Sequence, residues 1–71
     1  NDMKDFENKK IKITLNSNSG WVTVTGAYIK EEGNFLVFYN PAIKKIQYFS
    51  TFYIKSIEIL GDYKEGEEDE E

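Results

Sequence analysis

The residue composition changes abruptly at Gly61, and this change limits the folds that the chain can adopt. Residues 9–60 predict five short β-strands joined by tight turns, with no helical segment longer than a turn or two. Residues 61–71 read GDYKEGEEDEE, a run of like charges with one aromatic side chain, which cannot form a core by itself. We therefore expect a small folded domain over residues 1–60 and a disordered acidic tail over residues 61–71.

The composition argues against several classes of protein. The chain has no Cys and no His, which removes disulfides, thiolate chemistry, the usual general base and the commonest metal ligand. No segment approaches the ~20 apolar residues of a membrane span, and the N-terminus lacks a signal-peptide pattern. No glycine-rich phosphate loop is present. We expect a cytoplasmic protein that is not an enzyme, with no cofactor, no metal, no membrane partner and no small-molecule substrate.

The net charge of −4 is unevenly distributed: residues 1–8 contribute −2, and the two parts that follow carry opposite charges. Residues 9–60 carry seven Lys and three Glu, a net +4, whereas residues 61–71 carry seven acidic residues and one Lys, a net −6. Every basic residue is Lys, which argues against the bidentate phosphate contacts that Arg makes. The tail has three interpretations: an inert solubilising segment, a nucleic-acid mimic for a basic partner, or a shield over the domain's own lysines.

The hydrophobic pattern places the first strands. Residues 2–8 predict one or two helical turns, with Phe6 docked on the end of the domain. From Lys9 polar and apolar residues alternate, which predicts a strand that ends in a turn over residues 16–20. The second strand, at residues 21–30, contains Gly26, and a glycine inside a strand marks a bulge or a sharp bend of the kind that closes a small barrel.

The remaining strands follow from shorter runs. A turn at residues 31–34 precedes an apolar strand over residues 35–39, whose two faces should both be covered. Two further strands are expected at residues 46–52 and 55–60, with Ile57 and Ile59 directed inward. The link near residues 53–54 is too short for a hairpin loop and predicts a single 3₁₀ turn. The fold class is therefore all-β: a small five-stranded, bent-sheet, SH3/Sm-like barrel.

This pattern resembles the Sm-like superfamily of small β-barrels, which includes Hfq and the Sm and LSm proteins. The resemblance spans roughly residues 3–60 and rests on the segments KIKITL, VTVTGAYI, NFLVF and FYIKSIEI. It implies rings formed by pairing of the fourth and fifth strands of neighbouring chains, and binding of uridine- or adenine-rich RNA. It also implies that Phe35 matches the aromatic on which a base stacks, and Phe49 the aromatic that opens the second RNA-binding motif.

The chain departs from the family at that second motif. Ser50-Thr51 stands where the Hfq pattern has a Lys-His pair, the Arg-Gly pair of other members is missing, and the turn at residues 31–34 lacks the family's Asp spacing. Two hypotheses therefore stay open: a homo-oligomeric single-stranded RNA-binding protein, or a protein-protein interaction module. The second would be an adaptor or inhibitor, of phage or mobile-element origin for example, that uses its edge strands or its acidic tail.

Both hypotheses name candidate residues. Exposed aromatic side chains next to lysines can stack bases and contact phosphates. The candidate nucleic-acid residues are Trp21, Phe35, Tyr48, Phe49, Lys10, Lys12, Lys44 and Lys45, with Tyr28 and Tyr53 as further aromatics. The candidate interface residues are Ile46, Tyr48, Phe52, Ile57 and Ile59. For Phe35, Phe38, Phe49 and Phe52 a core or interface position is the expected role, and a solvated turn is the expected place of Lys44 and Lys45.

Overall fold

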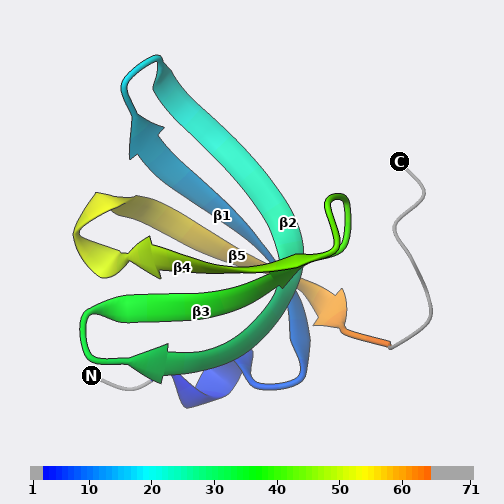
Figure 1. Ribbon diagram of the computed structural model, residues 1–71. Helices are drawn as coiled ribbons and strands as arrows, with labels where there is room; N and C mark the ends of the chain where they lie inside the picture. Colours follow the sequence, from blue (N-terminus) through cyan, green and yellow to red (C-terminus); the bar gives the residue numbers. More distant parts are fainter. Residues whose placement is uncertain (1–2, 65–71) are drawn as a thin grey trace.

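The computed structural model describes residues 3–64, which form one five-stranded antiparallel sheet and two single-turn 3₁₀ helices (Figure 1). In chain order the elements are η1 (Lys4–Phe6), β1 (Lys9–Ser17), β2 (Gly20–Glu32), β3 (Phe35–Asn40), β4 (Lys45–Ser50), η2 (Thr51–Tyr53) and β5 (Ile54–Asp62). The strand order is β4-β3-β2-β1-β5. β4 and β5 are therefore the two edges of the sheet, although only η2 separates them in sequence. The all-β prediction is confirmed.

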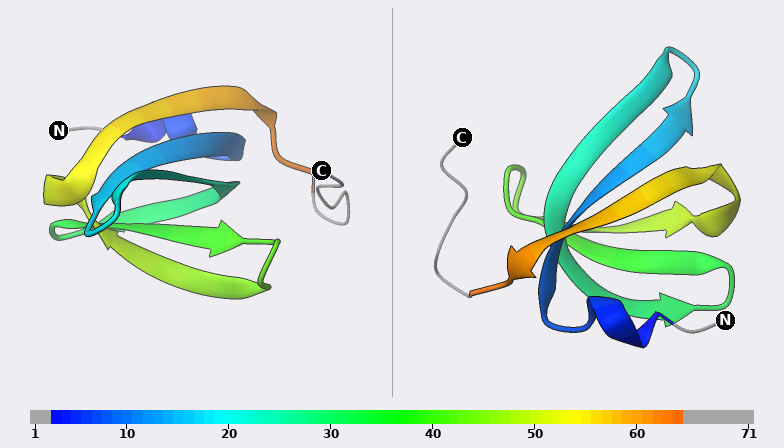
Figure 2. Two further views of the ribbon diagram at one scale, coloured as in Figure 1. Left: turned by 90° about the horizontal axis from the view of Figure 1, so that it is seen from above. Right: turned by 180° about the vertical axis from the view of Figure 1, so that it is seen from behind.

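The sheet folds over on itself along β2, as the views of Figure 2 show. The first part of β2 pairs with β1 as far as Ala27, and the part from Ala27 onward pairs with β3. A Cβ atom on Gly26 would lie 2.8 Å from the Phe38 ring and 2.9 Å from Pro41 Cδ, so only glycine fits at this bend. The predicted bend at Gly26 is confirmed, and the irregular register that accompanies it lies just beyond, between Tyr28 and Lys30.

The core lies between the two halves of the bent sheet. Its buried side chains come from the inner faces of β1, β2 and β3 and are Ile11, Ile13, Leu15, Tyr28, Leu36 and Phe38. Leu36, Val37 and Phe38 are buried in succession, which confirms that both faces of β3 are covered here. Phe6 packs against this core with its ring 5.9 Å from that of Tyr28, as the sequence predicts.

Several strand ends differ from the prediction. β4 ends at Ser50 rather than at residue 52, because the Ser50 side chain accepts a hydrogen bond from the backbone N–H of Phe52 and caps η2. The predicted 3₁₀ turn is present but begins earlier, at Thr51. β5 continues through Gly61 and Asp62, which the sequence assigned to the acidic tail. The rest of that tail, residues 65–71, lies outside the described residues.

One expected core position is wrong. Ile59 faces Ile11 across the β1–β5 pair but is 46% exposed, because β5 is an edge strand and no strand lies beyond it. Phe52, expected in the core or at an interface, is 77% exposed on η2, so the core role is excluded. Ile57 is half-buried and packs against the core, as predicted.

Candidate interaction surfaces

The outer edge of β4 presents unpaired backbone groups. Thr51 donates its backbone N–H to the Asn34 carbonyl oxygen at 2.8 Å, in the same register that pairs Phe35 with Ser50. Hydrogen-bonded and non-hydrogen-bonded pairs alternate along an antiparallel ladder. The backbone N–H and C=O groups of Ile46, Tyr48 and Ser50 therefore point away from β3. Because β4 is the last strand of the sheet, they point to its open edge.

The same edge carries apolar side chains. Ile46 is 59% exposed and Tyr48 53% exposed, and Phe52 follows on η2. A six-residue edge strand with exposed large apolar groups is a template for pairing with another chain. The structure thus brings three of the predicted interface residues together on β4 and η2.

The opposite edge, β5, is apolar but less regular. Ile59 and Leu60 are both exposed, and Glu58 lies 3.7 Å from Lys12 of β1. The register of the β1–β5 pair shifts twice, beside Leu60 and again beside Lys55, and the stretch between the shifts is regular. Leu60 is an exposed apolar residue of this edge that the sequence analysis did not include among the interface residues. Its bulged position is not visible in the alternation pattern.

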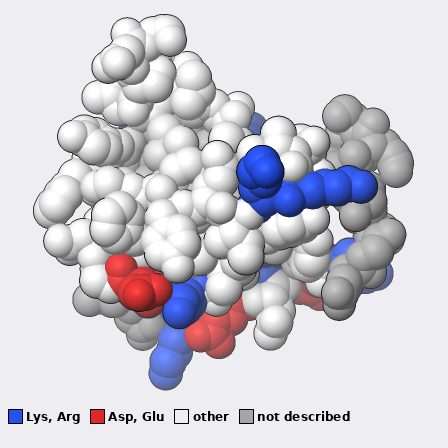
Figure 3. Space-filling model, viewed as in Figure 1, with Lys and Arg blue, Asp and Glu red and all other residues white. Residues whose placement is uncertain are grey.

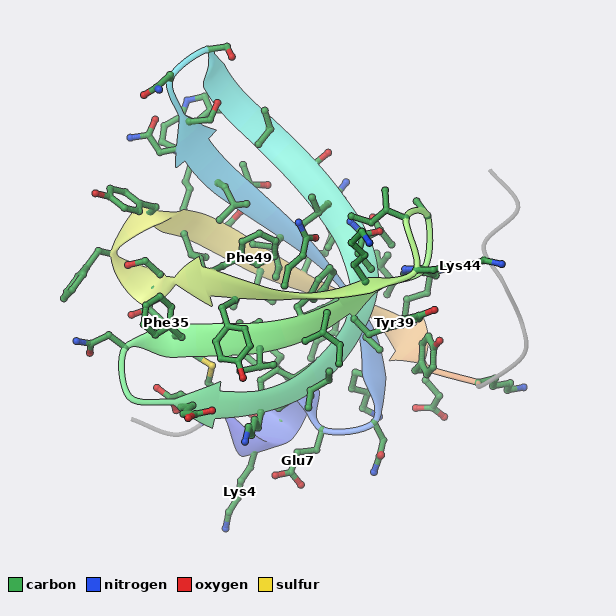
Figure 4. All side chains as sticks on the ribbon, in the orientation of Figure 1. Lys4, Glu7, Phe35, Tyr39, Lys44 and Phe49 are labelled. Atoms are coloured by element: carbon green, nitrogen blue, oxygen red, sulfur yellow. The ribbon has the colours of Figure 1, made fainter. Side chains whose placement is uncertain are left out.

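The aromatic candidates fall into different environments. Phe35 and Tyr48 are exposed and meet edge to face, with ring centroids 6.1 Å apart. Trp21 is also exposed, but the Lys55 ammonium lies 4.7 Å above its ring. Phe49 is half-buried and packs against the core, with its ring 5.6 Å from that of Phe38; Figure 4 labels both Phe49 and the exposed Phe35.

The lysine candidates do not gather around the exposed aromatic pair. Lys12 faces Glu58, and Lys10 is half-buried on β1. Phe35 pairs with Ser50 at one end of the β3–β4 hairpin, whereas Lys45 pairs with Asn40 at the other end. Figure 4 shows Phe35 and Lys44 on opposite sides of the molecule, and in Figure 3 most of the surface between is uncharged.

Besides the Lys12–Glu58 pair, a shorter ion pair joins β5 to β1. Lys9 Nζ lies 2.8 Å from Asp62 Oδ1, at the end of the β1–β5 ladder. The hydrogen bond from Lys9, and then the positive charges of Lys9 and Lys64, hold the pKa of the Asp62 carboxyl below its usual value. The pair therefore favours docking of the strand end at neutral pH.

Groups that could do chemistry are sparse. Among residues 3–64 no cluster of three or more acidic residues could hold a metal ion. A shallow pocket of about 320 Å³ opens beside the β1–β2 turn, lined by Asn16, Ser17, Asn18 and Tyr53. Tyr53 is the only one of these four that the sequence analysis named, and none of the four is paired with an activating base. In the described part of the chain, no helix has the length and apolar character needed to cross a bilayer.

Comparison with models of known protein families, with curated proteins and with solved structures finds no match to this chain. The assignment of a function therefore has to come from the surfaces described above.

Proposed function

We propose that this protein is a non-catalytic, Sm-like β-barrel that self-associates through its two open edge strands. The observation that carries the proposal is the strand order, which leaves β4 and β5 at opposite edges. Each edge exposes large apolar side chains next to backbone groups that lack a partner strand within residues 3–64. A chain with two different edges pairs head to tail with copies of itself, and such pairing closes into a ring if the rotation permits.

The Sm-like part of the proposal rests on the arrangement of the elements. A short helical turn precedes the sheet, β2 bends at Gly26 and is shared between both halves, and a 3₁₀ turn links the two edge strands. This arrangement supports the proposal of a small Sm-like barrel. The non-catalytic part rests on the absence of His and Cys from the chain and on the lack of an activated nucleophile.

Two substitutions at one position test the proposal. Tyr48→Pro removes a backbone N–H that points to the open edge, where proline is tolerated within the monomer, whereas Tyr48→Ala removes only the ring. We expect the wild type to form a stable oligomer of 8.3 kDa chains by light scattering, Tyr48→Pro to be monomeric, and Tyr48→Ala to keep part of the association. Circular dichroism checks that both variants fold.

The outcomes separate the hypotheses. A wild type that stays at 8.3 kDa at every concentration would overturn self-association, and a different protein would then be the expected partner of the edges. Oligomers that are equally stable in the proline and alanine variants would show that the β4 backbone is not the contact.

The exposed pair Phe35–Tyr48 favours a second function, binding of single-stranded RNA. A base stacked on such a platform contributes about 1–3 kcal/mol. We expect short uridine- or adenine-rich RNA to bind with a Kd below roughly 10 μM at low salt, and Phe35→Ala to weaken binding. Phe52→Ala, a change of an exposed aromatic outside the pair, is the matched control. Affinity weaker than this limit, or equal loss in both variants, would reject the RNA function.

A further inference from the structure

Two neighbouring lysines, Lys44 and Lys45, lie where the turn after β3 meets the start of β4. Lys44 and Lys45 are exposed, and neither forms an ion pair within residues 3–64. By contrast Lys9, Lys12 and Lys30 each lie within 4 Å of a carboxylate, at 2.8, 3.7 and 3.3 Å. The turn thus carries two neighbouring positive charges that no carboxylate within residues 3–64 compensates.

The turn that carries these lysines is held in place at its base. The buried Asn40 side chain donates to Gln47 Oε1 at 3.0 Å and accepts from the Ala42 backbone N–H at 3.1 Å. Pro41 is buried beneath the bend at Gly26, and Lys44 adopts a left-handed backbone with φ of 56°. The two lysines are therefore presented by a turn that is held at its base, on which Figure 4 labels Lys44.

The chain also contains the matching negative charge. In the sequence, residues 65–71 come shortly after the end of β5, and six of these seven residues are acidic. Fully extended, seven residues reach up to about 24 Å. Gly61, near the end of β5, is the first of a row of paired residues that crosses the whole sheet. The row continues through Lys10, Ala27 and Tyr39 to Ile46, which is the neighbour of Lys45.

The direction of edge pairing decides where this segment goes in an assembly. A parallel pair of β4 with β5 of a second copy would bring Lys45 near Lys55, at the start of β5, and the like charges would repel. An antiparallel pair brings the start of β4, with Lys44 and Lys45, to the end of the second copy's β5. The chain of that copy leaves β5 there, and the acidic residues 65–71 follow in its sequence.

We propose that residues 65–71 of one copy bind the Lys44–Lys45 turn of the neighbouring copy and so fix the direction of strand pairing. The proposal rests on the self-association proposed above. Exposed ion pairs are individually weak and are screened by salt. The contact therefore adds a salt-sensitive increment to an apolar interface rather than replacing it.

The test compares two full-length variants with the wild type by sedimentation at about 0.05 M and 0.5 M salt, concentrations that bracket strong and weak screening. The first variant is Lys44→Gln/Lys45→Gln. The second replaces the acidic residues by their amides: E65Q, E67Q, E68Q, D69N, E70Q and E71Q. We expect each variant to raise the dissociation constant of the assembly about three- to tenfold at low salt and much less at high salt. A variant that combines both sets of substitutions should raise the dissociation constant no more than either set alone.

Mixing the two variants distinguishes a contact between copies from one within a copy. The lysine variant keeps its acidic segment and the amide variant keeps its lysines, so a mixed assembly restores the contact only if it joins two copies. We expect the mixture to associate more tightly than either variant alone.

The results also separate this inference from the self-association on which it depends. No gain on mixing, or additive effects of the two sets, would overturn the inference while the assembly itself still formed. A monomeric wild type would overturn the self-association proposal, and with it the neighbour contact.

Discussion

Gly26 and Tyr39 meet at the bend of β2, so closely that a Cβ atom on Gly26 would overlap the carbonyl oxygen of Tyr39. This approach lets β2 pair with β1 on one side of the bend and with β3 on the other. The strand order leaves β4 and β5 as the two edges of this folded sheet. The folded shape of the sheet, and with it the placement of these two edges, depends on this glycine.

The bend should not tolerate a methyl group. Gly26→Ala forces the added Cβ into backbone and into the Phe38 ring, and overpacking of this kind costs about 1–3 kcal/mol or more. We expect a clear loss in the free energy of unfolding, measured by urea denaturation. Thr23→Ala, on the exposed part of the same strand, is the control and should change stability much less. Equal stability of the two variants would mean that β2 does not bend here.

Two phenylalanines should differ sharply in their contribution to stability. Phe38 is fully buried, and truncation to alanine at such a site costs about 3–5 kcal/mol. Phe52 is 77% exposed, and Phe52→Ala should change stability by no more than about 0.5 kcal/mol. Far-UV circular dichroism during thermal unfolding measures both. A large loss for Phe52→Ala in the monomer would show that η2 packs against the core.

The Lys9–Asp62 ion pair predicts a specific pH dependence. Because the pKa of Asp62 is lower in the folded chain than in the unfolded chain, the pair stabilises the fold at neutral pH. This stabilisation is lost as the pH falls below about 4 and through the folded pKa. The urea midpoint of the wild type should therefore exceed that of Asp62→Asn at pH 7, and the difference should shrink at acid pH.

A second measurement isolates the Asp62 titration. Lys9→Ala should raise the pKa of Asp62, followed by carboxyl-carbon NMR, whereas Lys30→Ala, at a different ion pair, should leave it unchanged. A pKa of Asp62 that stays the same in Lys9→Ala would contradict the conclusion that Lys9 lowers it.

Trp21 is the only tryptophan, so its fluorescence reports on its contact with Lys55. The ammonium over the ring attracts anions, and Lys55→Ala should reduce quenching by iodide relative to quenching by neutral acrylamide. The cation–π contact is exposed, so the same substitution should cost only about 0.5–1 kcal/mol of stability. An unchanged ratio of the two quenching constants would show that Lys55 does not sit on the ring in solution.

Local sequence pattern predicted much of the fold because it reflects burial along each strand. Ile11, Ile13 and Leu15 alternate with polar residues, and all three are buried on β1. The bend followed from a single residue, Gly26, because few other reasons place glycine within such a strand. The 3₁₀ turn followed from the shortness of the link between the last two strands.

The surfaces were harder to predict because exposure depends on the neighbouring strands. Phe35 and Phe49 look alike in sequence, yet Phe49 packs on Phe38 while Phe35 is exposed. Ile59 has the spacing of a core residue but lies on an edge strand. The lysine candidates looked like one basic group, and the structure separates Lys12, which faces Glu58, from Lys44 and Lys45.

Amide hydrogen exchange along β4, measured by NMR at high and low protein concentration, tests edge pairing most directly. In the monomer the backbone N–H groups of Ile46 and Tyr48 face solvent and should exchange fast, whereas those of Gln47 and Phe49 face β3 and should exchange slowly. Self-association through β4 predicts that Ile46 and Tyr48 become protected at high concentration and lose this protection on dilution. Fast exchange of both amides at every concentration would contradict it.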